Sequence, residues 1–337
     1  DHFNMVGGYP LPVPHPTSWL VIGPWELLAG IPALHAVRRL AARSGLRRGR
    51  LVLVQLWFAV VVLTPCAAWS HPEDVLAIAF LLYGLTALHD GRQERAALWV
   101  AAAVCSKQWA LVAIPFLLVR TAPGSRRRVL LWCVVPPVLM AAFPLAVNWS
   151  DASQCLLFPP VPPAVRDGHY SLVVPLFTRL AGVHGSMLGR AMELSAAPVV
   201  AYVLRRRPEA AQLGGLGGVL LLRLFFEPVV FPYYVAPAAT LIGLACIAAS
   251  RRLPLELMWW QAVLTVWLLL ASPRNGLWWT GAVVLVVAMG WGGWRSVAAA
   301  RRPACLRRPP PRRWPTLYRF SNFVSKSSRI LDFGTKL

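Results

Sequence analysis

His71, Glu73 and Asp74 stand together in HPEDVLAIAFLLYGLTALHD, residues 71–90, immediately before a long apolar run. A charged side chain beside hydrocarbon is costly, so such groups are usually paired, turned toward water or functional. An acid in the first turn of a helix also meets unpaired N–H groups and the positive end of the helix dipole. Capping accounts for one acid. Three titratable groups in so short a stretch, next to Pro72, favour a functional role.

Lys107 is the second candidate, at the centre of the apolar segment 96–119. It is the only lysine before Lys326 in a chain that otherwise uses arginine. An ammonium at this depth cannot easily extend to water, so we expect it to have an anionic partner. Two alternatives stay open. The partner is either the phosphate of a substrate in a water-filled cleft or a carboxylate such as Glu26, which would make the lysine structural.

A third polar group lies near the end of another apolar run. Arg223 and Glu227 are four residues apart, so they share a helix face and could form an ion pair. Tyr233 and Tyr234 follow at the depth of a membrane interface, where tyrosine commonly serves only as an anchor. An arginine, an acid and two tyrosines at one level would also suit a sugar-phosphate headgroup, because arginine binds phosphate bidentately. All four are candidate substrate-binding residues.

The elements that position these groups are apolar segments. Of the 337 residues, 57% are hydrophobic and 14% are charged, and the mean hydropathy is +0.55. We therefore predict an all-α fold, a polytopic transmembrane helical bundle of about nine full spans, each near the ~20 residues that a crossing needs. The expected spans are 18–37, 51–69, 75–90, 129–147, 188–204, 210–226, 233–250, 254–272 and 277–296.

Arginine clusters decide how segment 96–119 runs. Most of the net charge of +21 lies in short clusters between apolar runs, which is typical of cytoplasmic loops and argues against nucleic-acid binding. A single crossing would place three clusters outside. A re-entrant pair of short helices meeting near Lys107 places every cluster on the cytoplasmic side and His71, Glu73 and Asp74 outside. The clusters lie at 38–50, 92–95, 120–128, 205–207, 251–252 and 301–313.

We expect the chain to consist of a transmembrane domain and a basic tail. Residues 1–300 form the transmembrane domain, which would lack an N-terminal span because 1–17 then lies outside. Residues 301–337 form a basic, disordered cytoplasmic tail whose composition changes abruptly from 315 onward. The six cysteines show no CxxC or Cys/His spacing, so neither a zinc site nor a disulfide framework is predicted. Abundant arginine and alanine favour a bacterial, multi-pass plasma-membrane protein.

The stretch HPEDVLAIAFLLYGLTALHDGRQERAALWVAAAVCSKQWALVAIPFLLVR resembles polytopic glycosyltransferases of the C superfamily. It is most similar to the bacterial polyprenol-phosphate-mannose-dependent mannosyltransferases of glycosyltransferase family 87. A polar motif opens a span, a basic loop follows, and a short helix pair carries a central lysine before a P-x-LL stretch, here Pro115 to Leu118. The resemblance covers residues 51–150, and beyond them it extends to topology only.

This resemblance implies transfer of a sugar, most plausibly mannose, from a polyprenyl-phosphate donor to a glycan or glycolipid acceptor on the external membrane face. Such an inverting displacement needs a carboxylate base for the acceptor hydroxyl and cations for the leaving phosphate. In that superfamily the base usually lies in the first external loop, which we expect to be cut short here at Asp1. HPED also departs from the commoner motif, which leaves Glu73 or Asp74, with His71, as catalytic candidates. No cofactor and no metal ligand are assigned.

A transporter or lipid flippase is the alternative function, because broken helices and buried charge also build transport sites. Depth discriminates between the two functions. A transporter concentrates its polar groups at mid-bilayer and carries internal repeats, whereas here the groups lie near the external surface and no repeat is visible. A catalytically inactive homologue is a third alternative.

Overall fold

The computed structural model describes most of the first 270 residues and a few positions beyond them. Contacts within the chain group Asp1–Ala300 into one unit and Arg301–Leu337 into a second, and the expected tail at 301–337 lies outside the described residues. The described residues are 4–6, 9–11, 16–68, 71–150, 152–153, 185–226, 232–250, 254–270, 283–284, 287–288, 290–292 and 294.

Apart from one short hairpin, the described part of the chain is helical, in agreement with the predicted all-α class. Strands β1 (Asn4–Val6) and β2 (Tyr9–Leu11) pair antiparallel. The α-helices are α1 (Pro16–Arg43), α2 (Arg48–Phe58), α3 (Thr64–Ala68), α4 (Pro72–His89), α5 (Gln93–Ser106), α6 (Ala113–Arg120), α7 (Arg126–Val147), α10 (Gly185–Leu204), α11 (Glu209–Phe226), α12 (Ala236–Ser250) and α13 (Leu255–Leu270).

Three described segments are long and apolar enough to cross a membrane, namely Arg48–Ala67, Pro72–His89 and Pro123–Val147. This supports membrane association, but it is fewer than the nine full spans predicted. One reason is length: α12 and α13 have 15 and 16 residues, below the ~20 that a crossing requires. The expected span 277–296 lies largely outside the described residues.

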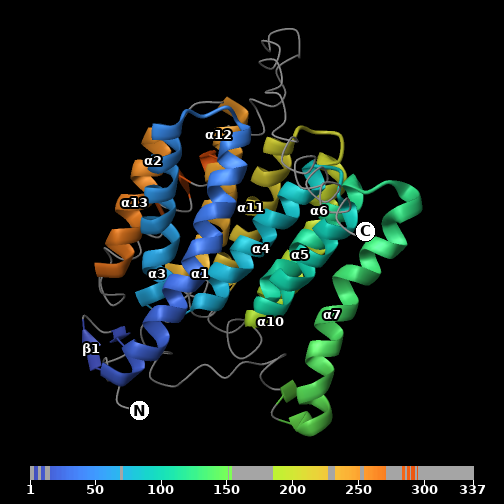
Figure 1. Ribbon diagram of the computed structural model, residues 1–337, viewed down its shortest axis with the longest axis horizontal. Coiled ribbons are helices and arrows are strands. Elements are labelled where there is room, and N and C mark those ends of the chain that lie inside the picture. The colour runs from blue at the N-terminus through green and yellow to red at the C-terminus, as the bar shows by residue number, and fades with distance from the viewer. Residues whose placement is uncertain are drawn as a thin grey trace, which may run out of the picture. The chain divides into compact units, whose positions relative to one another are not determined.

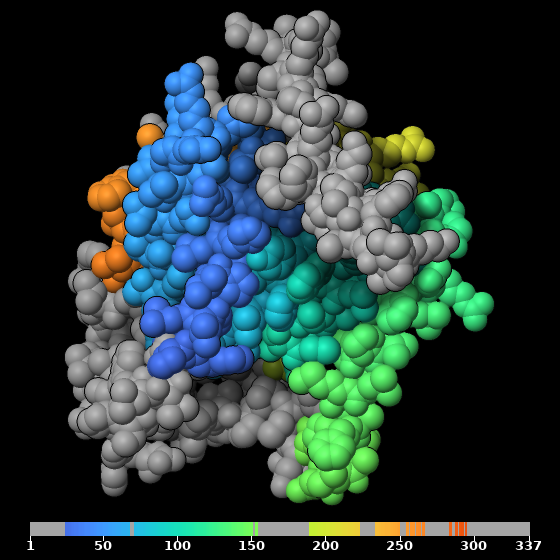
Figure 2. Space-filling model, viewed as in Figure 1, coloured from blue at the N-terminus to red at the C-terminus, as the bar shows by residue number. Residues whose placement is uncertain are grey.

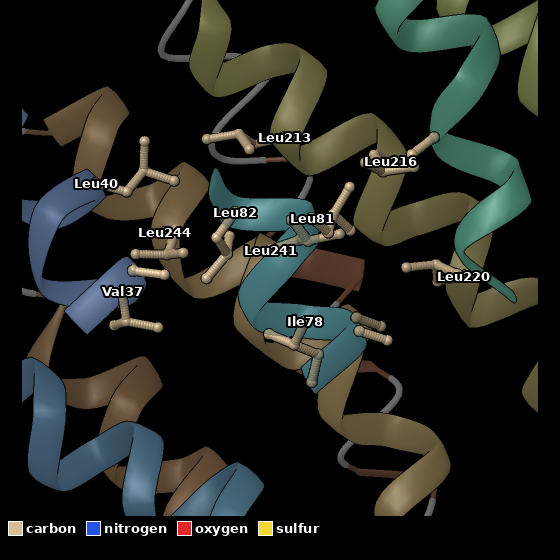
Figure 3. Close-up of a cluster of buried hydrophobic side chains, with 14 of the residues drawn as sticks. Val37, Leu40, Ile78, Leu81, Leu82, Leu213, Leu216, Leu220, Leu241 and Leu244 are labelled. Carbon is tan, nitrogen blue, oxygen red and sulfur yellow. The ribbon is translucent and has the colours of Figure 1, made fainter. Parts of the chain in front are cut away.

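Helix α4 lies at the centre of the hydrophobic core. Its apolar residues point in all directions, as expected for a helix that is buried on every side. Figure 3 shows Ile78, Leu81 and Leu82 of α4 among side chains from α1, α11 and α12. Helix α5 packs closely on α4 at Gly84, where a Cβ would come within 3.1 Å of Val100 Cγ2. The site described below is therefore built on a helix that α1, α5, α11 and α12 enclose.

A π-helical segment, Ala59–Leu63, joins α2 to α3. The backbone N–H of Thr64 donates to the carbonyl of Ala59, and the Thr64 hydroxyl donates to the same oxygen at 3.1 Å. The three pieces therefore form one continuous helical rod. Before the π-helical segment, the indole Nε1 of Trp57 donates to Oε1 of Gln261 at 3.0 Å, which ties the rod to α13.

Helix α7 lies at the edge of the first unit and exposes most of its apolar side chains. Figures 1 and 2 show its C-terminal part, in green, standing away from the neighbouring helices. Only Val129 and Cys133 of this helix are buried, whereas Leu139 is 67% and Phe143 is 75% exposed. A continuous apolar surface of this kind is unusual beside water and normal beside lipid tails. It supports membrane association independently of helix length.

Candidate functional site

The first turn of α4 fixes the positions of three candidate residues. His71 precedes the helix, and its backbone N–H donates to the carbonyl of Cys66 at 2.8 Å, which anchors the turn after α3. Pro72 occupies the first helical turn, where its missing N–H costs no hydrogen bond. Glu73 and Asp74 follow directly, so their carboxylates lie at the positive end of the α4 dipole.

The chain then returns to this level through α5. Gly91, with a φ of 75°, allows the tight turn between the two helices, and α5 packs along α4 until it ends at Ser106. Lys107 has an extended backbone, with φ −154° and ψ 130°, and a 3₁₀ turn, Gln108–Val112, leads into α6. Arg120 at the end of α6 shares a pocket with His89 at the end of α4. The segment formed by α5, the 3₁₀ turn and α6 thus reverses direction at Lys107, and α6 ends near His89, at the end of α4 from which α5 begins.

This reversal brings Lys107 onto the two acids of α4. Its Nζ donates to Glu73 Oε1 at 2.7 Å and lies 2.9 Å from Asp74 Oδ2. Glu73 Oε1 also lies 2.6 Å from Nδ1 of His71. The prediction that Lys107 has an anionic partner is confirmed; of the two alternatives, the partner described is a carboxylate, and contact with a substrate phosphate stays a prediction. We call His71, Glu73, Asp74, Lys107 and Trp109 the Lys107 cluster.

The two acids of the cluster have different environments. The Asp74 side chain is only 4% exposed, and the indole Nε1 of Trp109 donates to its Oδ1 at 2.8 Å. The Glu73 side chain is 39% exposed. Asp74 is therefore a buried carboxylate held by an ammonium and an indole, whereas Glu73 reaches solvent and can meet a molecule that arrives there.

Aromatic rings cover His71. Its imidazole packs on the ring of Tyr233 with 4.0 Å between centroids, and Tyr234 meets Tyr233 edge to face at 4.7 Å. The two tyrosines belong to the 3₁₀ turn Pro232–Val235 that leads into α12. The structure thus brings the predicted tyrosines next to the predicted catalytic histidine, although the sequence had assigned them to separate roles.

Glu26 does not pair with Lys107, so that suggested partner is wrong. The carboxylates that contact the ammonium are Glu73 and Asp74, while Glu26 of α1 interacts electrostatically with His71 instead. Among the described residues, Oε1 of Glu26 is buried without a hydrogen-bond partner. Glu73 and Asp74 replace Glu26 as partners because the first turn of α4 lies directly beside Lys107, where the chain reverses direction.

The side chain of Arg223, in α11, and the whole of Glu227 lie outside the described residues. Their proposed ion pair and substrate contacts stay predictions. Trp109 is the site residue that the sequence did not single out. A tryptophan two residues beyond a buried lysine has no distinguishing local signal, since its role depends on α4 lying opposite.

One atom each from His71, Glu73 and Asp74 could act as metal ligands, because these atoms lie within 4.8 Å of one another. A histidine and two carboxylates are suitable ligands for a divalent transition metal. In this arrangement, however, the Lys107 ammonium already lies within 2.9 Å of both carboxylates. A divalent cation would have to displace it, so the residues fit a metal only if Lys107 moves.

No protein-family model matches this chain, and the comparison with curated proteins found no match.

Proposed function

We propose that this chain is an integral membrane glycosyltransferase that transfers a sugar, mannose by the resemblance, from a polyprenyl-phosphate donor to an acceptor hydroxyl on the external membrane face. The acceptor oxygen bonds to the anomeric carbon while the bond from that carbon to the phosphate oxygen breaks. The hydroxyl proton passes to a base on the protein, and the polyprenyl phosphate leaves with the bonding electrons.

The observation that carries this proposal is the contact of Lys107 with Glu73 and Asp74 at the start of α4. A proton acceptor and a cation are the two groups that the displacement requires. Here they come together from segments 34 residues apart. They lie at the end of α4 opposite His89, and the arginine clusters assign the His89 end to the cytoplasm.

Glu73 and His71 are the proposed proton acceptors. Because Nδ1 of His71 contacts Glu73, Nε2 is the ring nitrogen that would exchange a proton with an acceptor hydroxyl. Glu73 would then orient the ring and stabilise its protonated form, or take the proton directly on its exposed side. The flat face of Tyr233 against His71 limits the directions in which the imidazole can turn.

Asp74 and Lys107 are the proposed anion-binding pair. An ammonium has three N–H donors, and two of them face Glu73 and Asp74. The third is left for a phosphate oxygen of the donor. Asp74, buried and held by Trp109, keeps the ammonium in place and is a positioning residue in this scheme.

Depth favours a transferase over the alternative transporter. The Lys107 cluster is in the first turn of α4 rather than in its middle, which is occupied by Ile78, Leu81 and Leu82 of the core. A mid-bilayer transport site would be expected to hold charged groups at that central level, whereas a hydrogen bond there joins the Tyr83 hydroxyl to Nδ1 of His35.

The decisive experiment is a transfer assay. Membranes containing the chain are incubated with radiolabelled polyprenyl-phosphate mannose, and the appearance of label in a second glycan or glycolipid is followed. Wild type is expected to form product, and Glu73→Gln is expected to form it ~10²-fold or more slowly. Asp90→Asn, which removes an acid paired with Arg43 at the other end of α4, is the matched control and should remain active. No product from stably inserted wild type, with movement of intact donor across the bilayer, would favour the transporter.

Topology is tested by cysteine labelling. Ser125 lies at the start of α7, next to the arginines, and Ser153 lies beyond its other end. A cysteine at 125 should react with an impermeant thiol reagent only in opened membranes, whereas a cysteine at 153 should react in intact cells. Reaction at position 125 in intact cells would contradict the re-entrant assignment of 96–119.

A further inference from the structure

A basic hollow lies at the end of the first unit remote from the Lys107 cluster. It is formed where the turn between α4 and α5 meets the start of α7, and its volume is about 370 Å³. That volume falls within the ~300–1,000 Å³ range of small-molecule sites. Its lining residues are Gly91, Arg92, Gln93, Glu94, Arg95, Ser125, Arg128 and Val129.

The charges of this hollow favour an anion. Arg92, Arg95 and Arg128 line it together with a single acid, Glu94, so three positive charges and one negative charge leave +2. Arg128 Nη1 lies 3.0 Å from Glu94 Oε1, and both side chains are more than half exposed. An exposed pair of this kind contributes little energy and can open readily when a stronger partner arrives.

Two helix starts add to the positive potential. Helix α5 begins at Gln93 and α7 begins at Arg126, next to lining residues of the hollow. Neither preceding residue, Arg92 or Ser125, caps the first turn with a side-chain hydrogen bond. The N–H groups of a first helical turn attract anions, and phosphate most of all.

The surface next to the hollow is apolar. Leu130, Leu131 and Trp132 follow the buried Val129 on α7, one residue beyond Arg128, and are each exposed by 41% or more. A molecule with its phosphate in the hollow could therefore lay an alkyl chain along α7. A free phosphate would make no use of that surface.

We propose that this hollow binds the headgroup of an anionic phospholipid from the leaflet at the arginine-rich end. The arginines and the two helix starts bind the phosphate, and the exposed side chains of α7 contact the first acyl segment. Basic pockets between membrane helices on the cytoplasmic side are suited to such headgroups. The site is independent of the transferase reaction, because it lies at the other end of α4 and shares no residue with the Lys107 cluster.

The test measures lipid binding by the full chain in detergent. Phosphatidylglycerol is titrated in mixed micelles, with phosphatidylcholine as the zwitterionic comparison and sodium phosphate as the free anion, and bound lipid is counted by native mass spectrometry. Phosphatidylglycerol should bind more tightly than either comparison. The triple variant Arg92→Gln, Arg95→Gln, Arg128→Gln should bind it on the order of 10²-fold more weakly.

Two further variants separate a built site from general surface charge. Arg47→Gln, Arg48→Gln, Arg50→Gln removes the same charge from exposed residues that do not line the hollow, and it should bind phosphatidylglycerol as wild type does. Glu94→Gln removes the one acid and should raise the affinity several-fold. Equal losses in the two triple variants would overturn the proposal. Binding of inorganic phosphate as tight as that of phosphatidylglycerol would overturn the assignment to a lipid.

Discussion

The two ends of α4 hold their acids in opposite ways. At the beginning, Glu73 and Asp74 share the single cation Lys107, and the Asp74 side chain is almost fully buried. Just past the end, Asp90 has two cations to itself: Arg43 at 2.6 Å and Arg39 at 3.7 Å, with 30% of its side chain exposed. Two acids with one cation leave a net negative charge, whereas one acid with two cations leaves a net positive charge.

This difference separates a functional arrangement from a structural one. A partly exposed ion pair at a helix end, such as Arg43–Asp90, contributes about 1 kcal/mol and tolerates change. Holding a second acid against a lysine that already pairs with buried Asp74 works against folding, so stability alone does not explain why Glu73 lies there. An incompletely neutralised acid that is partly open to solvent can, however, accept a proton or approach a cationic or polar substrate. The start of α4 is therefore where we expect mutations to alter both stability and turnover.

Among the variants at the two ends of α4, replacing Lys107 should lower the stability of the protein most. Lys107→Met leaves buried Asp74 without its ammonium, and breaking such a pair costs roughly 3–5 kcal/mol. Thermal unfolding in detergent measures the loss. Arg43→Met at the other end is the control; it removes an ion pair with Asp90 and a hydrogen bond to the Thr86 carbonyl, and should cost about 1–2 kcal/mol. The double variant Lys107→Met, Asp74→Asn should recover part of the stability; no recovery would mean that Asp74 is not the group that the lysine neutralises.

Glu73→Gln should lower turnover more than stability. The change removes a proton acceptor that is 39% exposed and keeps its shape, so transfer activity should fall by ~10²-fold or more while abundance stays near wild type. Asp74→Asn should instead weaken donor binding, raising the apparent KM, because it loosens Lys107. Equal turnover in Glu73→Gln and wild type would assign the acid to helix capping.

Trp109→Phe should give an intermediate effect. It removes the indole N–H that donates to the Asp74 carboxylate, and a hydrogen bond to a charged group contributes about 1.5–3 kcal/mol. Trp57→Phe is a matched control, because it removes an indole donor to the neutral Gln261 at nearly the same distance, with an expected cost of about 0.5–1.5 kcal/mol. Comparing the two unfolding temperatures isolates the effect of the charge. A larger loss in Trp57→Phe would contradict a charged Asp74.

Asp90→Asn should have the smallest effect. Arg39 is 46% exposed and the closer Arg43 is still partly exposed, so the free energy of unfolding should change by about 1 kcal/mol and transfer activity should be unaltered. The measurement is best made at low and high salt, since screening weakens whatever the exposed pairs contribute. A loss comparable to that of Lys107→Met would remove the contrast between the ends of α4.

Local patterns in the sequence predicted the helices and the reversal well. Apolar runs located α4 and α7, and the arginine clusters placed the turn at Lys107, because charge and hydrophobicity act residue by residue. The acidic first turn and the need of Lys107 for an anionic partner were predicted for the same reason. The number of membrane-crossing helices was not, since several described helices are shorter than their apolar runs suggested.

Contacts between distant segments escaped prediction. Nothing near Trp109 in the sequence indicates that its indole meets Asp74, 35 residues away. The stacking of Tyr233 on His71 likewise depends on how α12 packs beside the turn after α3. Such contacts are set by the packing of the whole helical unit, which one sequence without its three-dimensional arrangement does not specify.

The π-helical segment at Ala59–Leu63 determines how the side chains before it are rotated about the helix axis relative to those after it. A π-turn accommodates one more residue than an α-turn, so the side chains on either side of it are rotated by roughly 100° relative to a continuous α-helix. Trp57 can therefore face Gln261 on α13 while Cys66, beyond the segment, faces the buried core. A one-residue deletion within this segment would leave composition and hydrophobicity almost unchanged. It would nevertheless turn one of these two faces away from its partner.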